Sequence, residues 1–282
     1  ISYSRHLQKI SPEGAKHYRP SILRRLAEPV FNLTILRQPA ERAVFWFYGS
    51  ALRRSRLHRT RILSYLSVGF GISLIMIVST GKMFWKAQSG NMLSLPLVLS
   101  FFLVLGIRDA TNIPLNLEAN WIFEITETPR RWSYFSALRK SIFVFALIPL
   151  YLLLFVFYGF IWNWTTSGLH CLYDLALAVL LVEGLFFQHR KFPFACSYLP
   201  GKSKLYIFWI VYVLLFLGYI FIPRWIEPYF LARPSRLIGF YGVIILIIAG
   251  LWLYHRYFFY EKNQILYEDN PEPALLELFH AT

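Results

Sequence analysis

Six long apolar stretches between Ile62 and Tyr254 constrain this sequence more than any other feature. Each is about 18 to 22 residues long, the length that an α-helix needs to cross a hydrocarbon core of roughly 30 Å. Because the bilayer interior offers no water to unpaired peptide groups, a chain crosses it as helices or as a closed barrel. The sequence therefore predicts an all-α fold, a polytopic membrane helical bundle with about six transmembrane helices.

The composition supports a membrane protein and argues against a nucleic-acid-binding domain. Hydrophobic residues make up 56% of the chain and the mean hydropathy is +0.45, which is more apolar than a water-soluble domain of this size tolerates. The net charge of +14 would suit nucleic acid, but Lys and Arg gather at the ends of the apolar stretches rather than on a separate polar face. We therefore expect membrane lipids, and no nucleic acid, among its partners.

The apolar stretches divide the chain into three regions. Residues 1–61 are a basic segment with an interfacial amphipathic helix near residues 41–57, residues 62–260 form a six-span transmembrane domain, and residues 261–282 form a polar tail. The expected spans cover residues 62–81, 87–107, 141–162, 169–188, 205–223 and 237–254. A polar segment, residues 108–140, separates the second and third spans, and residues 224–236 are expected to be a short link.

The basic residues near the span ends predict the orientation in the membrane. Sixteen lie on one side: Arg53, Arg54, Arg56, Arg59, Arg61, Arg108, Arg130, Arg131, Arg139, Lys140, Arg190, Lys191, Lys202, Lys204, Arg256 and Lys262. Five lie on the other side, namely Lys82, Lys86, Arg224, Arg233 and Arg236. Cytoplasmic loops carry the excess of Lys and Arg, so we expect both termini of this chain in the cytoplasm.

The segment 108–140 contains a candidate docking helix. On a helix, Leu117, Trp121 and Ile125 share an apolar stripe while Glu124 and Glu127 share an acidic one. Such a helix could dock a cytoplasmic partner, or it could be an interfacial helix that rests on lipid and on its own bundle. The candidate docking residues are Glu118, Trp121, Glu124, Glu127, Arg130 and Arg131.

Two acidic residues, Asp174 and Glu183, fall within the expected fourth span. An ionised side chain at the centre of a membrane helix costs roughly 2.5 to 3.5 kcal/mol on insertion scales, so such residues suggest function. Both positions lie near the ends of the expected span, where a structural pairing of Glu183 with His189 or Arg190 is also expected. The two interpretations are therefore anchoring by local ion pairs and a polar translocation path or proton relay.

No sequence motif assigns a catalytic, cofactor-binding or metal-binding residue. The seven histidines are scattered, without a His-Glu-x-x-His pair or a cluster of carboxylates, and no Gly-x-Ser-x-Gly elbow is present. The run Gly201-Lys202-Ser203 ends like a phosphate-binding loop, but Cys196 stands where that loop needs its first glycine. We therefore expect that the chain binds no cofactor itself and that any dependence on ATP comes through a separate subunit.

Three stretches carry a resemblance to known proteins: residues 39–45 (PAERAVF), residues 53–59 (RRSRLHR) and residues 117–123 (LEANWIF). Over residues 36–260 the chain resembles a largely uncharacterised bacterial family of multi-span proteins described as ABC-exporter-like permeases. The resemblance implies that residues 41–57 are an elbow helix and that residues 117–131 are a coupling helix that contacts an ATPase. Members of that family are longer, so we expect further spans upstream of Ile1.

These observations predict a permease subunit of an ABC-type export system in the bacterial cytoplasmic membrane. We expect it to be non-catalytic, to be driven by a separate ATPase that docks on residues 108–140, and to pair either with itself or with a second permease half. One alternative is an integral membrane enzyme acting on lipids, suggested by His170, Asp174, Glu183 and His189 around one span. The other alternative is a membrane assembly protein without a transport role.

Overall fold

The computed structural model describes residues 22–36, 38–80, 90–114, 127, 130–194, 205–260 and 265. Over these residues the secondary structure is helical, without a β-strand, and six helices are long and apolar enough to cross a membrane. The all-α polytopic membrane bundle expected from the sequence is confirmed.

Two helices precede the bundle, α2 (Ile22–Thr34) and α3 (Pro39–Arg54). The first two spans are α4 (Arg56–Thr80) and α5 (Gly90–Ala110), and the third is a continuous helix of α7 (Trp132–Ile142), η3 (Phe143–Leu147) and α8 (Ile148–Ile161). The last three spans are α9 (Trp164–Leu185), α10 (Leu205–Leu231) and α11 (Pro234–Tyr254), with η4 (His255–Phe259) after it. The elements η3 and η4 are π-helical turns.

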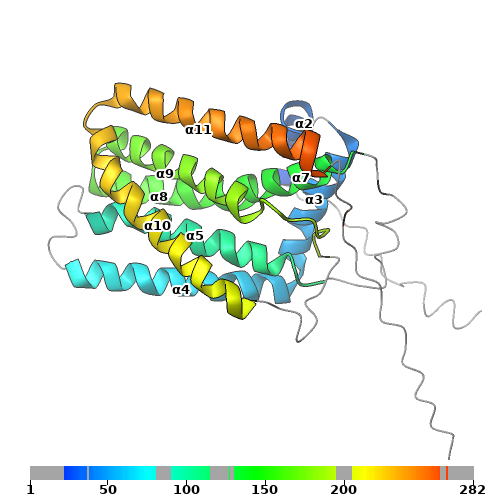
Figure 1. The fold of residues 1–282 in the computed structure, drawn as a ribbon, viewed down its shortest axis with the longest axis horizontal. Helices are drawn as coiled ribbons and strands as arrows, with labels where there is room; N and C mark the ends of the chain where they lie inside the picture. The colour runs from blue at the N-terminus through cyan, green and yellow to red at the C-terminus, as the bar shows by residue number, and fades with distance from the viewer. Residues whose placement is uncertain are drawn as a thin grey trace, which may run out of the picture.

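Successive spans run in opposite directions, so the bundle has two distinct ends (Figure 1). We call the end that holds Arg61, Arg108 and Arg139 the basic end, and the opposite end, where α8 meets α9 and α10 meets α11, the far end. At the basic end the segments that follow α5 and α9 meet, because the amide of Phe194 donates to the Thr111 carbonyl at 3.0 Å. This alternation places Arg61, Arg108, Arg139 and Arg256, which come from different spans or follow them directly, on one side of the molecule.

The spans differ in how much of their surface the protein covers. Fifteen of the 21 residues of α5 are buried but only three of the 25 in α4 are, so α5 lies at the centre and α4 at the periphery. The outer helices α10 and α11 also expose large apolar side chains, among them Leu214, Ile222 and Leu246. These outer surfaces suit contact with lipid tails.

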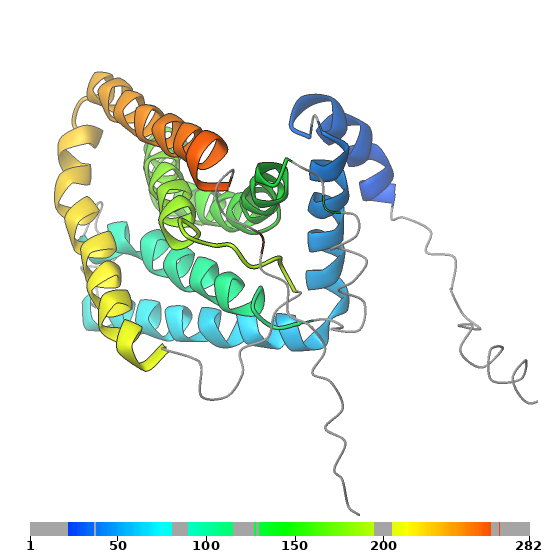
Figure 2. The same cartoon turned by 45° about the vertical axis from the view of Figure 1, so that its right-hand side comes forward.

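Helix α3 lies across the basic end of the bundle rather than along it (Figure 2). It packs against the third span: the rings of Phe45 and Phe145 lie 4.9 Å apart, and Lys140 donates to Glu41 at 3.0 Å. The sequence predicted an amphipathic helix over residues 41–57, and the structure forms one over residues 39–54. Its apolar face therefore contacts protein, where the sequence suggested contact with the membrane surface.

Several span boundaries differ from those expected, and three of these differences affect the polar residues of the spans. The third span begins at Trp132 rather than at residue 141, so the end of the expected polar segment 108–140 is helical. The fourth begins at Trp164 rather than at residue 169, because the side chain of Asn163 caps the helix by accepting from the Thr166 amide at 2.7 Å. The fifth continues to Leu231 through two prolines, although a proline commonly ends a helix.

Candidate functional site

The fourth span, α9, carries the two acidic residues that the sequence singled out, and the structure places them in different surroundings. Because α9 begins at Trp164, Asp174 lies about 15 Å along the helix from its start rather than near its end. Its side chain is fully buried. Glu183 lies close to the other terminus of the same helix, at the basic end.

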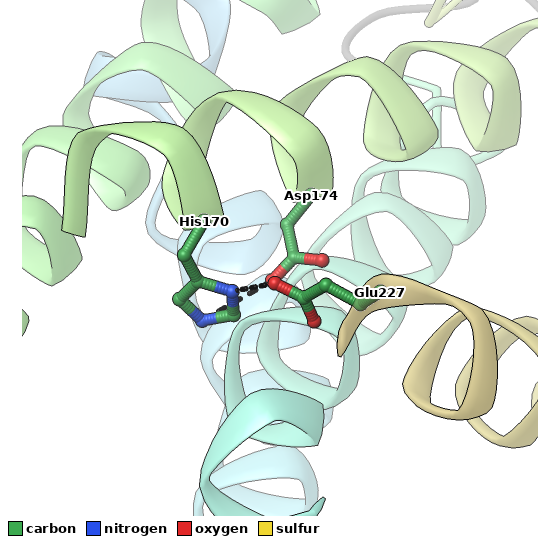
Figure 3. Close-up of side chains that lie close together, drawn as sticks. All are labelled: His170, Asp174 and Glu227. Carbon is green, nitrogen blue, oxygen red and sulfur yellow. Dashed lines mark hydrogen bonds and ion pairs between the residues drawn. The ribbon is translucent and has the colours of Figure 1, made fainter. Parts of the chain in front are cut away.

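Asp174 belongs to a cluster with His170 and Glu227 (Figure 3). His170 and Asp174 are one helical turn apart on α9, and Glu227 projects toward them from α10. His170 Nδ1 hydrogen-bonds Glu227 Oε1, and His170 Nε2 lies 3.6 Å from Asp174 Oδ2. One ligand-type atom from each residue lies within 4.8 Å of the other two, and all three side chains are fully buried.

Aromatic rings enclose the imidazole of this cluster. The ring of Tyr158 meets His170 edge-on at 4.8 Å between centroids, and Trp162 lies 5.4 Å away. The Tyr158 hydroxyl donates to the Met92 carbonyl at 2.7 Å, so its proton is used in that hydrogen bond and is not donated to the cluster. The imidazole of the cluster is therefore packed against aromatic rings.

Several polar atoms of the cluster lack a hydrogen-bond partner. They are both carboxylate oxygens of Asp174, Oε2 of Glu227 and Nε2 of His170, all of them buried. A buried polar atom without a partner costs about 1 to 3 kcal/mol, and more when it is charged. An arrangement of one imidazole and two carboxylates could hold a shared proton or a metal ion at this position.

Glu183 forms an ion pair with Arg139 of α7. Its Oε2 lies 3.1 Å from Arg139 Nε, and both side chains are mostly buried. The guanidinium also lies over the ring of Trp132, at 5.2 Å from its centroid. The partner of Glu183 is thus Arg139, from another span, and not His189 or Arg190 as the sequence suggested.

The Arg139–Glu183 pair borders a cavity of about 810 Å³ at the basic end. We call it the basic cavity, and it is lined by Ile35, Gln38, Glu41, Arg130, Arg131, Trp132, Ser136, Arg139, Lys140, Glu183, Trp252, Arg256, Tyr257 and Tyr260. Five of these side chains are cationic and two are acidic. Burial raises the pKa of Tyr260 to about 12, so its hydroxyl stays protonated at neutral pH.

His189 follows α9 at the same end of the bundle. Its ring packs against Phe135 and Phe186, and Tyr260 donates to its carbonyl at 3.0 Å. Burial, with a smaller contribution from the nearby cations Arg108, Arg139 and Lys191, lowers the pKa of His189 to about 3. His189 is therefore a neutral packing residue at neutral pH.

The expected docking residues are only partly within the described chain. Glu118, Trp121 and Glu124 lie outside the described residues. Glu127 pairs with Arg131 at 2.6 Å, one helical turn apart in sequence, and Arg130 and Arg131 line the basic cavity. The docking assignment stays a prediction, and its last two residues also take part in the cavity.

Sequence reasoning missed Glu227 and therefore missed the cluster. It placed residue 227 in a link between spans, because Pro223 was taken as the end of the fifth span. The expectation that no carboxylate cluster exists is wrong, since Asp174 and Glu227 meet at His170. The four-residue spacing of His170 and Asp174 was visible in the sequence and was the one signal that could have indicated half of the site.

Comparisons of the chain with protein-family models, with curated proteins and with solved structures give no match. The resemblance to ABC-exporter-like permeases therefore stays a prediction.

Proposed function

We propose that this protein is the membrane-spanning subunit of an ABC-type export system, and that an anionic amphiphile occupies its basic cavity. The observation that carries the proposal is the position of that cavity. Six of its 14 lining residues, between Arg130 and Lys140, come from α7 and the two residues before it, which form the last part of the segment on which an ATPase is expected to dock.

The lining of the cavity suits a molecule with an acidic head and an apolar body. Cationic side chains such as Arg131 and Arg256 attract phosphate or carboxylate groups, and arginine does so through paired hydrogen bonds. Aromatic side chains, among them Trp252 and Tyr257, offer flat apolar surfaces beside these charges. A volume of about 810 Å³ is in the range of pockets that hold a small organic ligand.

Helix α7 can connect the docking segment to the cavity. Nine of its 11 residues are buried, so it cannot move without displacing its neighbours. A force applied near Arg131 would therefore shift α7 as a rigid body and change the positions of Arg139 and Lys140 in the cavity wall. The concentration of Lys and Arg at the basic end favours a cytoplasmic location for that end, where an ATPase would be found.

The test is whether an ATPase co-purifies with the protein when it is extracted from its native membrane. We expect the tagged full chain, purified from its own cells in mild detergent, to carry Mg-ATPase activity that phosphatidylglycerol stimulates. The double charge reversal E124K/E127K should reduce that activity to background, because it reverses the acidic stripe of the docking segment. Membrane insertion and yield should stay unchanged.

The double reversal R233E/R236E at the far end is the matched control, and it should keep the co-purifying ATPase activity. An absence of ATPase activity from the parent preparation would refute the export proposal. Equal activity in the parent and in E124K/E127K would remove the docking assignment.

A second candidate is an integral membrane enzyme acting on lipids, and the buried cluster of His170, Asp174 and Glu227 favours it. The same preparation distinguishes the two. An enzyme would convert a bound lipid without ATP, and mass spectrometry of the extracted lipids would detect the product. A transport subunit would release its lipid unchanged.

A further inference from the structure

We propose that His170, Asp174 and Glu227 form a binding site for a divalent first-row transition metal ion, with Zn²⁺ as the best-fitting ion. The site lies between α9 and α10, toward the far end, and none of its residues lines the basic cavity (Figure 3). It is independent of the export role proposed above.

The geometry of the three side chains is close to that of a metal site. The ligand-type atoms lie within 4.8 Å of one another, and two of the three residues share a face of α9 at a spacing of one turn. Zinc binds imidazole nitrogen and carboxylate oxygen at roughly 2.0 to 2.2 Å, which places tetrahedral ligand atoms about 3.4 Å apart. Small side-chain rotations would therefore bring His170, Asp174 and Glu227 onto one ion.

The unpartnered atoms of the cluster are an independent indication of a ligand. Asp174 is fully buried, yet neither of its oxygens accepts a hydrogen bond, and Oε2 of Glu227 is also without a partner. Figure 3 shows both carboxylate groups turned toward the imidazole. Native structures pair nearly all such atoms, so an ion among these oxygens would supply the partner that the protein does not.

The charge of the cluster points in the same direction. Among the described residues, the ion-pair partner of both carboxylates is His170 alone, and no Lys or Arg pairs with either one. Two ionised carboxylates repel each other and are costly to bury. One divalent cation would neutralise both at once, whereas neutralisation by protons requires one proton for each carboxylate.

The donor set selects the kind of ion. Mg²⁺ and Ca²⁺ require six or more oxygen ligands, more than this enclosed cluster offers, and they rarely use imidazole. Zn²⁺ accepts imidazole together with carboxylates and is satisfied by four ligands. With three protein ligands, a zinc ion here would keep a fourth position for water or an exchangeable molecule, as catalytic sites do.

The test measures metal bound by the purified full chain, isolated through a tag without histidine. After EDTA treatment, equilibration with Zn²⁺ and gel filtration, the parent should retain one zinc per chain by elemental analysis. H170A, D174N and E227Q should each lose that zinc. The control E183Q removes a carboxylate from the same helix that pairs with Arg139, and it should still retain one zinc.

Cobalt provides a second measurement, and its first part uses the parent with all three side chains in place. The parent loaded with Co²⁺ should show the intense visible absorption of a four-coordinate ion rather than the weak spectrum of hydrated cobalt. H170C should add a thiolate-to-cobalt charge-transfer band in the near ultraviolet, because the sulfur would then be a ligand.

Each outcome decides the proposal. A parent that retains no zinc and leaves the cobalt spectrum unchanged would show that the cluster holds only protons. Equal zinc content in the parent, H170A, D174N and E227Q would place any bound metal elsewhere in the chain. If H170A, D174N and E227Q fail to fold, the cobalt spectrum of the parent decides the matter, because it requires no substitution.

Discussion

Two buried acidic residues of α9, Asp174 and Glu183, differ in the residues that lie next to their carboxylates. Glu183 has a fixed cation, Arg139, from the neighbouring third span at 3.1 Å. Asp174 has no cation among the described residues and instead shares His170 with a second carboxylate, Glu227. One acid has a cationic partner within the fold, whereas the other has no Lys or Arg partner among the described residues.

The difference follows from where along the bundle each acid lies. Lys and Arg gather at the basic end of the spans, so a residue near that end has cationic side chains within reach. Asp174 lies about 15 Å into its helix, where the neighbouring spans present apolar and aromatic side chains. An acid at that depth can be compensated only by a group that enters from outside or by a proton.

The largest effect is expected when the cation of the Arg139–Glu183 pair is removed. R139M should destabilise the protein by about 3 to 5 kcal/mol, because it leaves Glu183 buried without its counter-ion. The midpoint of thermal unfolding in detergent measures this loss. The double variant R139M/E183M should recover most of it, and a double variant as unstable as R139M would show that the pair is not the source of the effect.

The second prediction concerns whether D174N raises or lowers the stability of the protein, with and without zinc. Without metal, D174N should be at least as stable as the parent, because it removes one of two repelling carboxylates. With Zn²⁺ at 100 times its dissociation constant, the parent should gain about 2.7 kcal/mol that the variant does not. The order of the two unfolding midpoints should therefore invert between EDTA and zinc, and an unchanged order would contradict the metal site.

The smallest effect concerns His189, beside the Arg139–Glu183 pair. Its pKa of about 3 in the fold lies below the value near 6.5 expected when unfolded, so the unfolded chain binds the proton first as pH falls. The stability from His189 is present above the unfolded pKa and is lost on acidification, by roughly 1 kcal/mol between pH 7 and pH 5.5.

H189Q should flatten this part of the pH dependence of the unfolding midpoint while leaving stability above pH 7 nearly unchanged. Parallel pH profiles for the parent and H189Q would show that His189 is not held neutral in the fold. That result would also reopen the pairing of His189 with Glu183 that the sequence suggested.

The sequence alone located the spans well but did not identify which residues pair with the charged side chains inside them. Hydropathy located all six spans, yet Pro223 led to an early end for the fifth one, which hid Glu227 in an expected link. Proline disfavours a helix interior but does not forbid it where neighbouring helices hold the backbone in place. Glu183 was likewise matched with residues close in sequence, while its cation comes from another span.

The sequence by itself determined a helical membrane bundle with most of its cations at one end, because the length of an apolar stretch and the charge of a loop are local properties that decide how a segment inserts into a bilayer. Only the tertiary structure decided that His170 and Glu227, 57 residues apart, meet at Asp174. That contact depends on how α9 and α10 are rotated and where they cross. No local pattern in either helix specifies such a rotation, because it is set by packing against the rest of the bundle.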